Sequence, residues 1–481
     1  MNVKIVLRLL GVLLLFPGTF MAFCLLMAFY YEEPEAVKSL GFATGIAVSS
    51  ALVLFFSGNA SRESIYRREA LVVVGLGWIL SCLLGSLPYL FSDCVSSFSD
   101  AFFESVSGFT TTGATVIGDI ELLPRSILFW RMLTHWLGGM GIIVLFVAVF
   151  PQMAGGAKQM FRSEVPGPVA EGLRPKIKET ALTLWKIYII LTLVETALLK
   201  AAGMSLFDAF CHSISTIATG GFSTQNGSIA EYNNIVVEVI IAVFMLIAGA
   251  NFGLYYAILK GRIWSLFVNA EFRSYVAILL VVSIVVGLSI SNQHGDSFTA
   301  IRYSVFQTIS VMTGTGLCTD DFGSYPPIAM ASLVCLMFIG GCAGSTSGGM
   351  KVSRVIVIFK VAYQEIVHAF RPQVRMSVRL GHSVVDREIV YSILVFVVSF
   401  IFIAAMSTLL MAAFGLDLVT SFSSVVACLA NVGPGLATVG PLETYENIPT
   451  VGKLLLSVLM LLGRLELGVL LALFIPGFWR R

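Results

Sequence analysis

Four short segments of the chain share a pattern that could hold a dehydrated cation. They align without gaps as DAFFESVSGFTTTGAT (100–115), DAFCHSISTIATGGFS (208–223), YSVFQTISVMTGTGLC (303–318) and TSFSSVVACLANVGPG (420–435). One aligned column contains only glycine: Gly113, Gly221, Gly316 and Gly433. Glycine accepts a positive φ, which lets carbonyl groups on successive residues point the same way. Carbonyls arranged in this manner can replace the water shell of an ion, so the pattern predicts a carbonyl-lined ion site.

Each of these glycines, taken alone, is explained as well by helix packing or by a loop. The register of the four segments argues against that explanation, because other aligned columns also agree in kind. One column holds Phe102, Phe210, Val305 and Phe422, and another holds Ser107, Ser215, Ser310 and Ala427. Each segment is typical of an amphipathic helix of about ten residues followed by a glycine-containing turn. Such a helix is only about 15 Å long, half the thickness of a bilayer.

Long apolar runs surround these segments and place the chain in a membrane. Of the 481 residues, 57% are hydrophobic and only 12% are charged. A soluble core of this size cannot absorb so much apolar surface, which excludes a soluble globular enzyme. Charge-free stretches such as 9–31, 39–61 and 389–416 reach the ~20 residues that cross a bilayer. The sequence therefore predicts an all-α, polytopic (multi-pass) membrane protein.

The distribution of basic residues predicts how the chain is oriented in the membrane. Most of the 30 Lys and Arg residues lie in six places: 4–8, 62–68, 158–178, 260–273, 351–387 and 480–481. Positively charged loops stay in the cytoplasm, so both termini are expected there. Three apolar stretches separate some of these loops, although an even number must cross. We expect the third stretch to be a re-entrant half-helix that dips in from the outer side, covered there by protein or by a water-filled cavity.

The resulting plan is a pair of spans followed by four units, each with a span, a half-helix, a turn and a second span. The predicted spans are 5–31 and 37–58, then 70–92 and 126–151, 180–202 and 233–260, 272–292 and 328–368, and 387–415 and 451–476. The predicted domains are an N-terminal two-span domain (1–69) and pore repeats at 70–157, 158–262, 263–380 and 381–481. The four turns would surround one pseudo-fourfold pore, with the partially negative ends of the half-helices toward the ion.

The motifs in these units resemble the Trk/Ktr/HKT superfamily of potassium transporters. The resemblance is carried by VSGFTTTGAT, ATGGFST and NVGPG, and by IGGCAGSTSGGMK (339–351), GGMGIIV (138–144), SEVPGP (163–168), EFR (271–273) and LLGRLE (461–466). The N-terminal pair of spans favours the TrkH branch, whose members are bacterial potassium-translocating subunits. The resemblance implies a cell inner membrane location and a homodimer in which each subunit has its own pore.

The same resemblance assigns the residues of a potassium selectivity filter. They are Thr111, Thr112 and Gly113; Thr219, Gly220 and Gly221; Gly314, Thr315 and Gly316; and Asn431, Val432 and Gly433. In plant relatives a serine at the first filter glycine accompanies sodium transport, and this chain has Gly113 there. Potassium is therefore expected as the substrate ion at the filter, with no cofactor in this chain. The eight cysteines form no CxxC pair, which predicts neither another metal site nor a disulfide framework.

A glycine-rich break in the second span of the third unit, GGCAGSTSGG (340–349), is a candidate gate. Glycine costs about 1 kcal/mol per helical position relative to alanine, so this stretch makes a poor spanning helix. A small-residue packing face between helices is the alternative interpretation. The family carries an intramembrane loop here, and we favour a gate that must move for conduction. Its residues are Gly340, Gly341, Gly344, Ser345, Thr346, Ser347, Gly348 and Gly349, together with Arg464.

Arg464 is predicted about 20 Å deep in the membrane, where an arginine costs at least ~2.5–3.5 kcal/mol. It could bond the carbonyls of the glycine-rich break, since the family has an arginine at this position beneath the filter, or it could pair with a carboxylate of another element. Glu104 could hold the filter through hydrogen bonds or face the outer vestibule. His135 and His212 are interpreted as core histidines, and Glu195 has no assigned role.

The sequence favours a channel-like subunit for potassium uptake, driven by an inside-negative potential. The chain has no GxxxxGK[ST] phosphate loop, so control by nucleotide needs another chain. The family pairs with a cytosolic ring of nucleotide-binding, TrkA-like subunits, which we expect to dock on 151–180 and 351–387. A sodium- or proton-coupled secondary transporter is the alternative, although four parallel units differ from its usual inverted repeats. No enzymatic activity is predicted, since the chain contains no HExxH motif.

Overall fold

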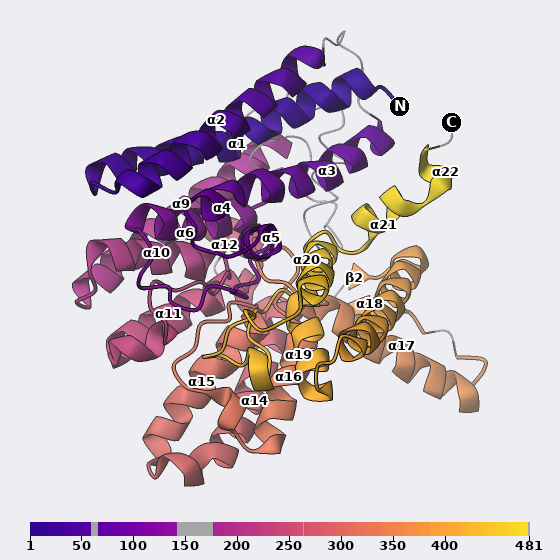
Figure 1. Cartoon of the computed structure of the whole chain (residues 1–481). Helices are drawn as coiled ribbons and strands as arrows, with labels where there is room; N and C mark the ends of the chain where they lie inside the picture. The colour runs from indigo at the N-terminus through magenta and orange to yellow at the C-terminus, as the bar shows by residue number, and fades with distance from the viewer. Residues whose placement is uncertain (59–65, 142–176, 263, 375, 382, 480–481) are drawn as a thin grey trace.

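The computed structural model of the chain describes residues 1–58, 66–141, 177–262, 264–374, 376–381 and 383–479, which are predominantly helical (Figure 1). The α-helices are α1 (Val3–Tyr30), α2 (Pro34–Ser57), α3 (Arg67–Gly85), α4 (Leu87–Phe91), α5 (Phe98–Phe109), α6 (Arg125–Gly139), α9 (Ile177–Ala201), α10 (Leu206–Ile217), α11 (Ile235–Ala248), α12 (Phe252–Leu259), α13 (Ser265–Val268), α14 (Ala270–His294), α15 (Ser297–Thr313), α16 (Pro327–Ile339), α17 (Val352–Phe370), α18 (Arg387–Ala413), α19 (Leu418–Leu429), α20 (Thr450–Arg464), α21 (Gly468–Phe474) and α22 (Pro476–Trp479). Short 3-10 turns occur at η1 (Ser228–Tyr232), η2 (Phe322–Ser324) and η3 (Ala437–Val439). The strands β1 (Arg379–Leu380) and β2 (Ser383–Val384) pair antiparallel between α17 and α18.

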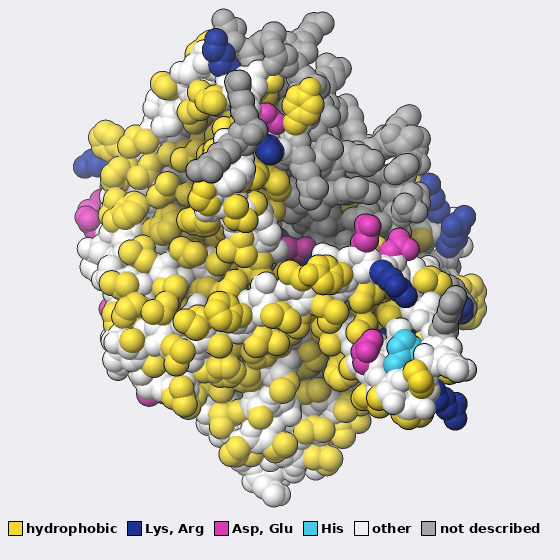
Figure 2. All heavy atoms as spheres, turned by 90° about the vertical axis from the view of Figure 1, so that its right-hand side faces the viewer, with side chains coloured by type: hydrophobic (Ala, Val, Ile, Leu, Met, Phe, Trp, Pro, Cys, Tyr) yellow, Lys and Arg dark blue, Asp and Glu magenta, His cyan; other side chains and the backbone are white. Residues whose placement is uncertain are grey.

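Six helical segments within the described residues are long and apolar enough to cross a membrane. They are Val3–Tyr30, Pro34–Ser57, Arg68–Phe91, Ala181–Ala201, Ala270–His294 and Arg387–Ala413. Many large apolar side chains on these helices are exposed, for example Leu280 and Ile284 on α14 and Phe402 on α18. Hydrophobic side chains are accordingly spread over much of the described surface in Figure 2, as expected for surface that contacts lipid. The prediction of an all-α, multi-pass membrane protein is confirmed.

Two of the predicted spans are broken rather than straight. The predicted span 233–260 divides into α11 and α12, which meet at an angle of 92°, and the predicted span 451–476 divides into α20 and α21 at 120°. The first break is explained by Asn251, whose side chain caps the new helix by accepting a hydrogen bond from Gly253 N at 2.7 Å. At the second break, Glu466 and Leu467 both have a positive φ, which ends the helical hydrogen bonding.

The second span of the third unit is interrupted where the sequence predicts it. Helix α16 ends at Ile339 and α17 begins at Val352, with an irregular segment between them. This segment, residues 340–351, is called the intramembrane loop below. Of the predicted span 126–151, α6 covers the first part, and the remainder from residue 142 lies outside the described residues.

Four helices, α5, α10, α15 and α19, occupy the positions of the predicted half-helices. Three of them have 12 residues, and α15 is longer than predicted, with 17. All four begin at an N-cap residue whose side chain accepts a hydrogen bond from the backbone N–H three residues later. The pairs are Ser97 and Asp100 N, Ser205 and Asp208 N, Asp296 and Thr299 N, and Asp417 and Thr420 N. This shared N-cap fixes the start of each short helix and hence the place where its C-terminal turn begins.

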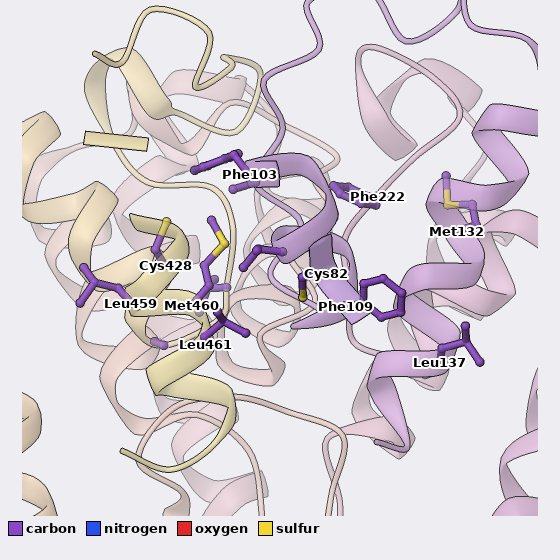
Figure 3. Close-up of a cluster of buried hydrophobic side chains, with 14 of the residues drawn as sticks. Cys82, Phe103, Phe109, Met132, Leu137, Phe222, Cys428, Leu459, Met460 and Leu461 are labelled. Carbon is purple, nitrogen blue, oxygen red and sulfur yellow. The ribbon is translucent and has the colours of Figure 1, made fainter. Parts of the chain in front are cut away.

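The buried core joins the first short helix to the last part of the chain. Helix α5 packs against α6 on one side and against α20 on the other. In Figure 3, Phe103 and Phe109 of α5 lie between Met132 and Leu137 of α6 and the group formed by Cys428, Leu459, Met460 and Leu461. These side chains are all buried, so the first and last turns are held close together by apolar packing.

Candidate functional site

The four short helices end in the same backbone turn. In each turn, the residue that leaves the helix has a positive φ. In chain order these residues are Thr111 (55°), Thr219 (52°), Gly314 (70°) and Asn431 (53°). The next N–H group, of Thr112, Gly220, Thr315 or Val432, donates back to the carbonyl of Ser107, Ser215, Ser310 or Ala427 over 2.8–2.9 Å. This bond closes the helix in each case. Because this bond uses only the backbone carbonyl of that column, alanine at position 427 can accept it as well as serine does.

The glycine column has two physical causes. Gly113, Gly221, Gly316 and Gly433 have φ values of 83°, 89°, 76° and 95°, which side chains rarely adopt. In addition, a Cβ atom on each of them would lie closer than 3.0 Å to a carbonyl oxygen of the following turn. The oxygens in question belong, in the same order, to Gly220, Thr315, Val432 and Thr112.

These approaches form a closed cycle, because the first turn lies against the second, the second against the third, the third against the fourth and the fourth against the first. We call residues 110–113, 218–221, 313–316 and 430–433 the turn ring. The carbonyls of Thr112, Gly220, Thr315 and Val432 accept no hydrogen bond from any described residue. A backbone carbonyl at a buried position normally has a partner. A ring of unpartnered carbonyls therefore suits a ligand that needs oxygen atoms, such as a cation.

The intramembrane loop lies against the turn ring. A Cβ atom on Gly348 would collide with the carbonyl of Ala430, and one on Gly314 would lie 3.5 Å from Gly348 N. The hydroxyl of Thr346 donates to the carbonyls of Ile217 (3.2 Å) and Ala248 (3.3 Å), at the ends of α10 and α11. The glycines here permit close backbone approach, so the packing explanation weighed in the sequence also describes part of what this segment does.

Arg464 connects three parts of this site at the end of α20. Its Nη1 donates to the carbonyl of Thr346 at 2.8 Å and to Oγ1 of Thr111 at 3.1 Å. Its Nη2 donates to the carbonyls of Gly138 (2.5 Å) and Gly139 (2.9 Å) at the end of α6. The predicted contact with a loop carbonyl is present. The contacts with Thr111 and with α6 were not predicted, because they join segments more than 300 residues apart.

The comparison with known proteins decides the family at this point. A sequence model of the TrkH family, described as a cation transport protein, matches residues 37–479. The chain belongs to the TrkH family of cation transport proteins. It is 38% identical over 486 residues to the Trk system potassium uptake protein TrkH of Escherichia coli (strain K12), and 37% identical to that of Salmonella typhimurium, with full coverage of both sequences. It is also 34% identical to the potassium uptake protein TrkG of Escherichia coli, over 94% of this chain and 93% of TrkG.

A solved structure agrees with this assignment. The crystal structure of the potassium transporter TrkH from Vibrio parahaemolyticus is similar, with a TM-score of 0.90 and 34% identity over 100% of both chains. The resemblance drawn from the motifs is thus confirmed at the level of the family. Two of those motifs, SEVPGP and the end of GGMGIIV, lie outside the described residues.

In this TrkH-family chain, three charged contacts hold the intramembrane loop and the helix that follows it. The Glu271 carboxylate on α14 accepts hydrogen bonds from Ala343 N (2.7 Å) and Ser353 N (3.1 Å), and so spans the loop. Lys351 Nζ donates to the carbonyl of Ser347. Sequence reasoning noted EFR (271–273) only as part of a motif. The signal available there was an acidic residue at the start of an apolar helix, which turns out to be buried.

The third charged contact lies at the break between α20 and α21. Arg354 of α17 donates from Nη2 to Oε2 of Glu466 at 2.7 Å. Glu466 is two residues from Arg464, and both line one cavity with residues 344–349 of the loop. The pair therefore links the helix that leaves the loop to the segment that carries Arg464.

One further aligned column holds a polar side chain in every short helix: Glu104, His212, Gln307 and Ser424. In the first three, this side chain bonds the chain just beyond the turn. Glu104 accepts from Thr115 Oγ1 (3.1 Å) and Val116 N (3.0 Å), His212 Nε2 accepts from Ser223 Oγ (3.0 Å), and Gln307 donates to Asp320 O (2.8 Å). In the fourth, the neighbouring Ser423 accepts from Leu436 N instead.

These contacts answer the questions left open for single polar residues. Glu104 is fully buried and holds the segment beyond the first turn, so it does not face the outer vestibule. His135 and His212 are buried and hydrogen-bonded through both ring nitrogens, as expected for core histidines. Glu195 is fully buried in α9 beside Thr216 of α10.

Proposed function

We propose that this chain takes up potassium across the bacterial cytoplasmic membrane through a channel-like pore in which the turn ring is the selectivity filter. The observation that carries the proposal is the closed cycle of four equivalent turns with unpartnered carbonyls. The choice of potassium is supported by the relatives, which are named potassium uptake proteins. Transport needs no fuel beyond an inside-negative potential, worth ~2.3 kcal/mol per unit charge per 100 mV.

The filter residues of the proposal are those assigned from the motifs: 111–113, 219–221, 314–316 and 431–433. A ring of carbonyls suits a partly dehydrated cation because it offers several oxygens at fixed spacing without a full negative charge. The four short helices end at the ring, so their partially negative C-termini add to the attraction for a cation. The same scheme treats 1–69 as an N-terminal domain and 70–157, 158–262, 263–380 and 381–481 as pore repeats.

The intramembrane loop and Arg464 form the gate in this proposal. Their contacts with the ends of α10, α19 and α6 support this assignment. These contacts hold the loop and Arg464 against one side of the turn ring, where they would lie in the path of an ion. The guanidinium adds a positive charge that opposes a cation, so both must move for conduction. Regulation then comes from outside the chain, through a cytosolic nucleotide-binding partner of the TrkA type.

The partner would bind the side on which both termini are predicted to lie. The described part of its docking surface is α17 and the hairpin of β1 and β2, where Lys360, Arg371 and Arg379 are located. Of the other predicted docking segment, 151–180, residues 151–176 lie outside the described residues. A homodimer with one pore in each subunit completes the scheme.

The decisive experiment is potassium flux into proteoliposomes that contain only this chain, at a clamped potential and without a sodium or proton gradient. We expect flux that follows the potassium gradient and exceeds sodium flux under matched conditions. Flux that occurs only when a sodium or proton gradient is present would overturn the pore proposal in favour of a coupled transporter. Addition of the nucleotide-binding partner distinguishes a closed pore from an inactive protein.

A further inference from the structure

Helix α6 carries two buried polar side chains, one helical turn apart, that tie the first turn of the ring to the second. The first is Arg131, which is 1% exposed. Its Nε lies 2.6 Å from Oε1 of Glu104, which braces the segment beyond the first turn. Its Nη1 donates to the carbonyl of Ser223, just beyond the second turn, at 3.1 Å.

The ring of Phe222 fixes the plane of the Arg131 guanidinium. The guanidinium carbon lies 3.5 Å from the centroid of this ring, close enough for a cation–π interaction. One side chain thus contacts Glu104, which supports the first turn, and the two consecutive residues that follow the second turn. Lysine could not reproduce this set, because it lacks the planar fork of donors.

His135 makes a second connection in the same direction. Its Nδ1 lies 2.7 Å from the carbonyl of Gly108, in the last turn of α5, and its Nε2 lies 3.2 Å from the N–H of Phe222. Because the backbone N–H must donate, Nε2 accepts and Nδ1 carries the proton, so both nitrogens are used by the neutral ring. The imidazole also stacks on Phe222 with centroids 4.0 Å apart and occupies the space where a side chain at Gly220 would lie.

Two other ion pairs differ from this arrangement. Lys453–Asp100 joins α20 to α5, and the partly buried pair Arg302–Glu238 joins α15 to α11, with N–O distances of 2.6 and 3.1 Å. Within the described residues, the side-chain hydrogen bonds of Arg302 and Lys453 go to Tyr303 and Asp100, which lie outside the turn ring. A buried ion pair is weak evidence for stability, because desolvation offsets its attraction, so the position of Arg131 and Glu104 beside the ring points to another role.

We infer that Arg131 is a positioning residue for ion selectivity, and that with Glu104 and His135 it sets the separation of the first and second turns. The inference rests on the proposed function, since only a filter gives that separation a consequence. Potassium and sodium differ little in size, so a small outward shift of the Gly220 carbonyl relative to that of Thr112 changes which ion the ring favours. Contacts from α6 thereby fix the first and second turns relative to each other, in addition to the hydrogen bonds within each turn.

The test compares competing ions in proteoliposomes that hold the full chain. The variant is Glu104→Gln combined with Arg131→Gln, which removes both charges together and leaves no unpaired buried ion. The third short helix already has Gln307 in the Glu104 column, so glutamine fits there. We expect the potassium-to-sodium flux ratio to fall roughly tenfold, equivalent to about 1.4 kcal/mol between the two ions, while potassium flux persists.

Arg131→Lys is the second variant, because it keeps the charge and should fold even if the double variant does not. It should lower the ratio in the same direction. The matched control is Glu238→Gln combined with Arg302→Gln, which removes another ion pair of a short helix, one with a buried carboxylate, and should leave the ratio unchanged even if thermal stability falls. An unchanged ratio in the Arg131 variants, or an equal fall in the control, would overturn the inference alone. A wild-type chain without potassium-selective flux would overturn the proposed function and this inference together.

Discussion

Asn431 donates a hydrogen bond from Nδ2 to Oγ1 of Thr112 at 3.0 Å, across 319 residues of sequence. The same amide donates to the carbonyl of Met460 at 3.0 Å. Asn431 therefore closes the turn ring between its last and first members and attaches it to α20, the helix that ends at Arg464. An asparagine is suited to this place because it adopts the left-handed conformation observed there, with φ 53°, more readily than most residues.

Replacement of the first ring glycine should disturb selectivity more than stability. In Gly113→Ser, the added Cβ meets the carbonyl of Gly220 and the residue must keep φ near 83°, so the second turn is pushed away. We expect the potassium-to-sodium flux ratio to fall by roughly tenfold, or about 1.4 kcal/mol of relative ion affinity.

Gly45→Ser on α2 is the matched control for this change, because nothing lies within 4 Å of a Cβ at Gly45. Its flux ratio should equal that of the wild-type chain. If Gly113→Ser also leaves the flux ratio unchanged in a folded protein, the four aligned glycines have a structural role in the backbone turns and no role in ion selectivity.

Removal of the Arg464 side chain should open the closed state. Arg464→Ala deletes the hydrogen bonds to Thr346, Thr111 and the end of α6, and it removes a positive charge from the proposed ion path. We expect basal potassium flux without the partner to rise severalfold. Arg464→Lys keeps the charge but cannot make the forked contacts, so an intermediate flux would separate the electrostatic effect from the tethering effect. Flat basal flux in a folded Arg464→Ala protein would rule out the gate assignment.

Loss of the Glu271 carboxylate should loosen both ends of the intramembrane loop. Glu271→Ala leaves the N–H groups of Ala343 and Ser353 without their acceptor. Hydrogen bonds to a charged group are worth about 1.5–3 kcal/mol, so the midpoint of thermal unfolding in detergent should fall and basal flux should rise. Glu388→Ala is the control, since Glu388 also lies in the first turn of a spanning helix but is exposed. Equal effects of the two substitutions would contradict the proposed role of Glu271.

One N-cap should make thermal stability depend on acidity. The hydroxyl and N–H of Thr420 bond the Asp417 carboxylate at the start of α19 and lower its pKa below the ordinary 3.8. A lowered folded-state pKa stabilises the protein above pH 3.8, and this contribution is lost as the pH falls through the folded value. The difference in unfolding midpoint between the wild-type chain and Asp417→Asn should therefore shrink as the pH is lowered from 6 to about 3.

Asparagine is chosen for this substitution because it is also a good N-cap, so only the ionisable part is removed. Asp386→Asn is the control, because Asp386 precedes α18 but its side chain makes no capping hydrogen bond. It should show no such trend. A constant difference between wild type and Asp417→Asn across this range would exclude the ionised cap.

The sequence by itself determined the features that depend on local conformation and on hydrophobicity. Apolar length and the scarcity of charge required membrane-spanning helices, and four glycines in register required four equivalent turns, because a positive φ is a local demand. The break after Ile339 was also readable, since several glycines in one span weaken a helix directly. The contact between Arg464 and the loop was one of two outcomes that the sequence allowed, because a guanidinium inside the membrane needs either backbone acceptors or a carboxylate.

Only the tertiary structure decided which turn contacts which, where α11 and α20 break, and which groups hold the ring. The break at Asn251 depends on a carbonyl of the loop that accepts from Phe252 N at 3.0 Å, some ninety positions away in the chain. Glu104 and Arg131 each look like an isolated charge in an apolar run, and their joint role appears only when Ser223 is brought beside them. Such contacts join residues that are distant in sequence, so no local pattern encodes them, and they form only when the helices pack.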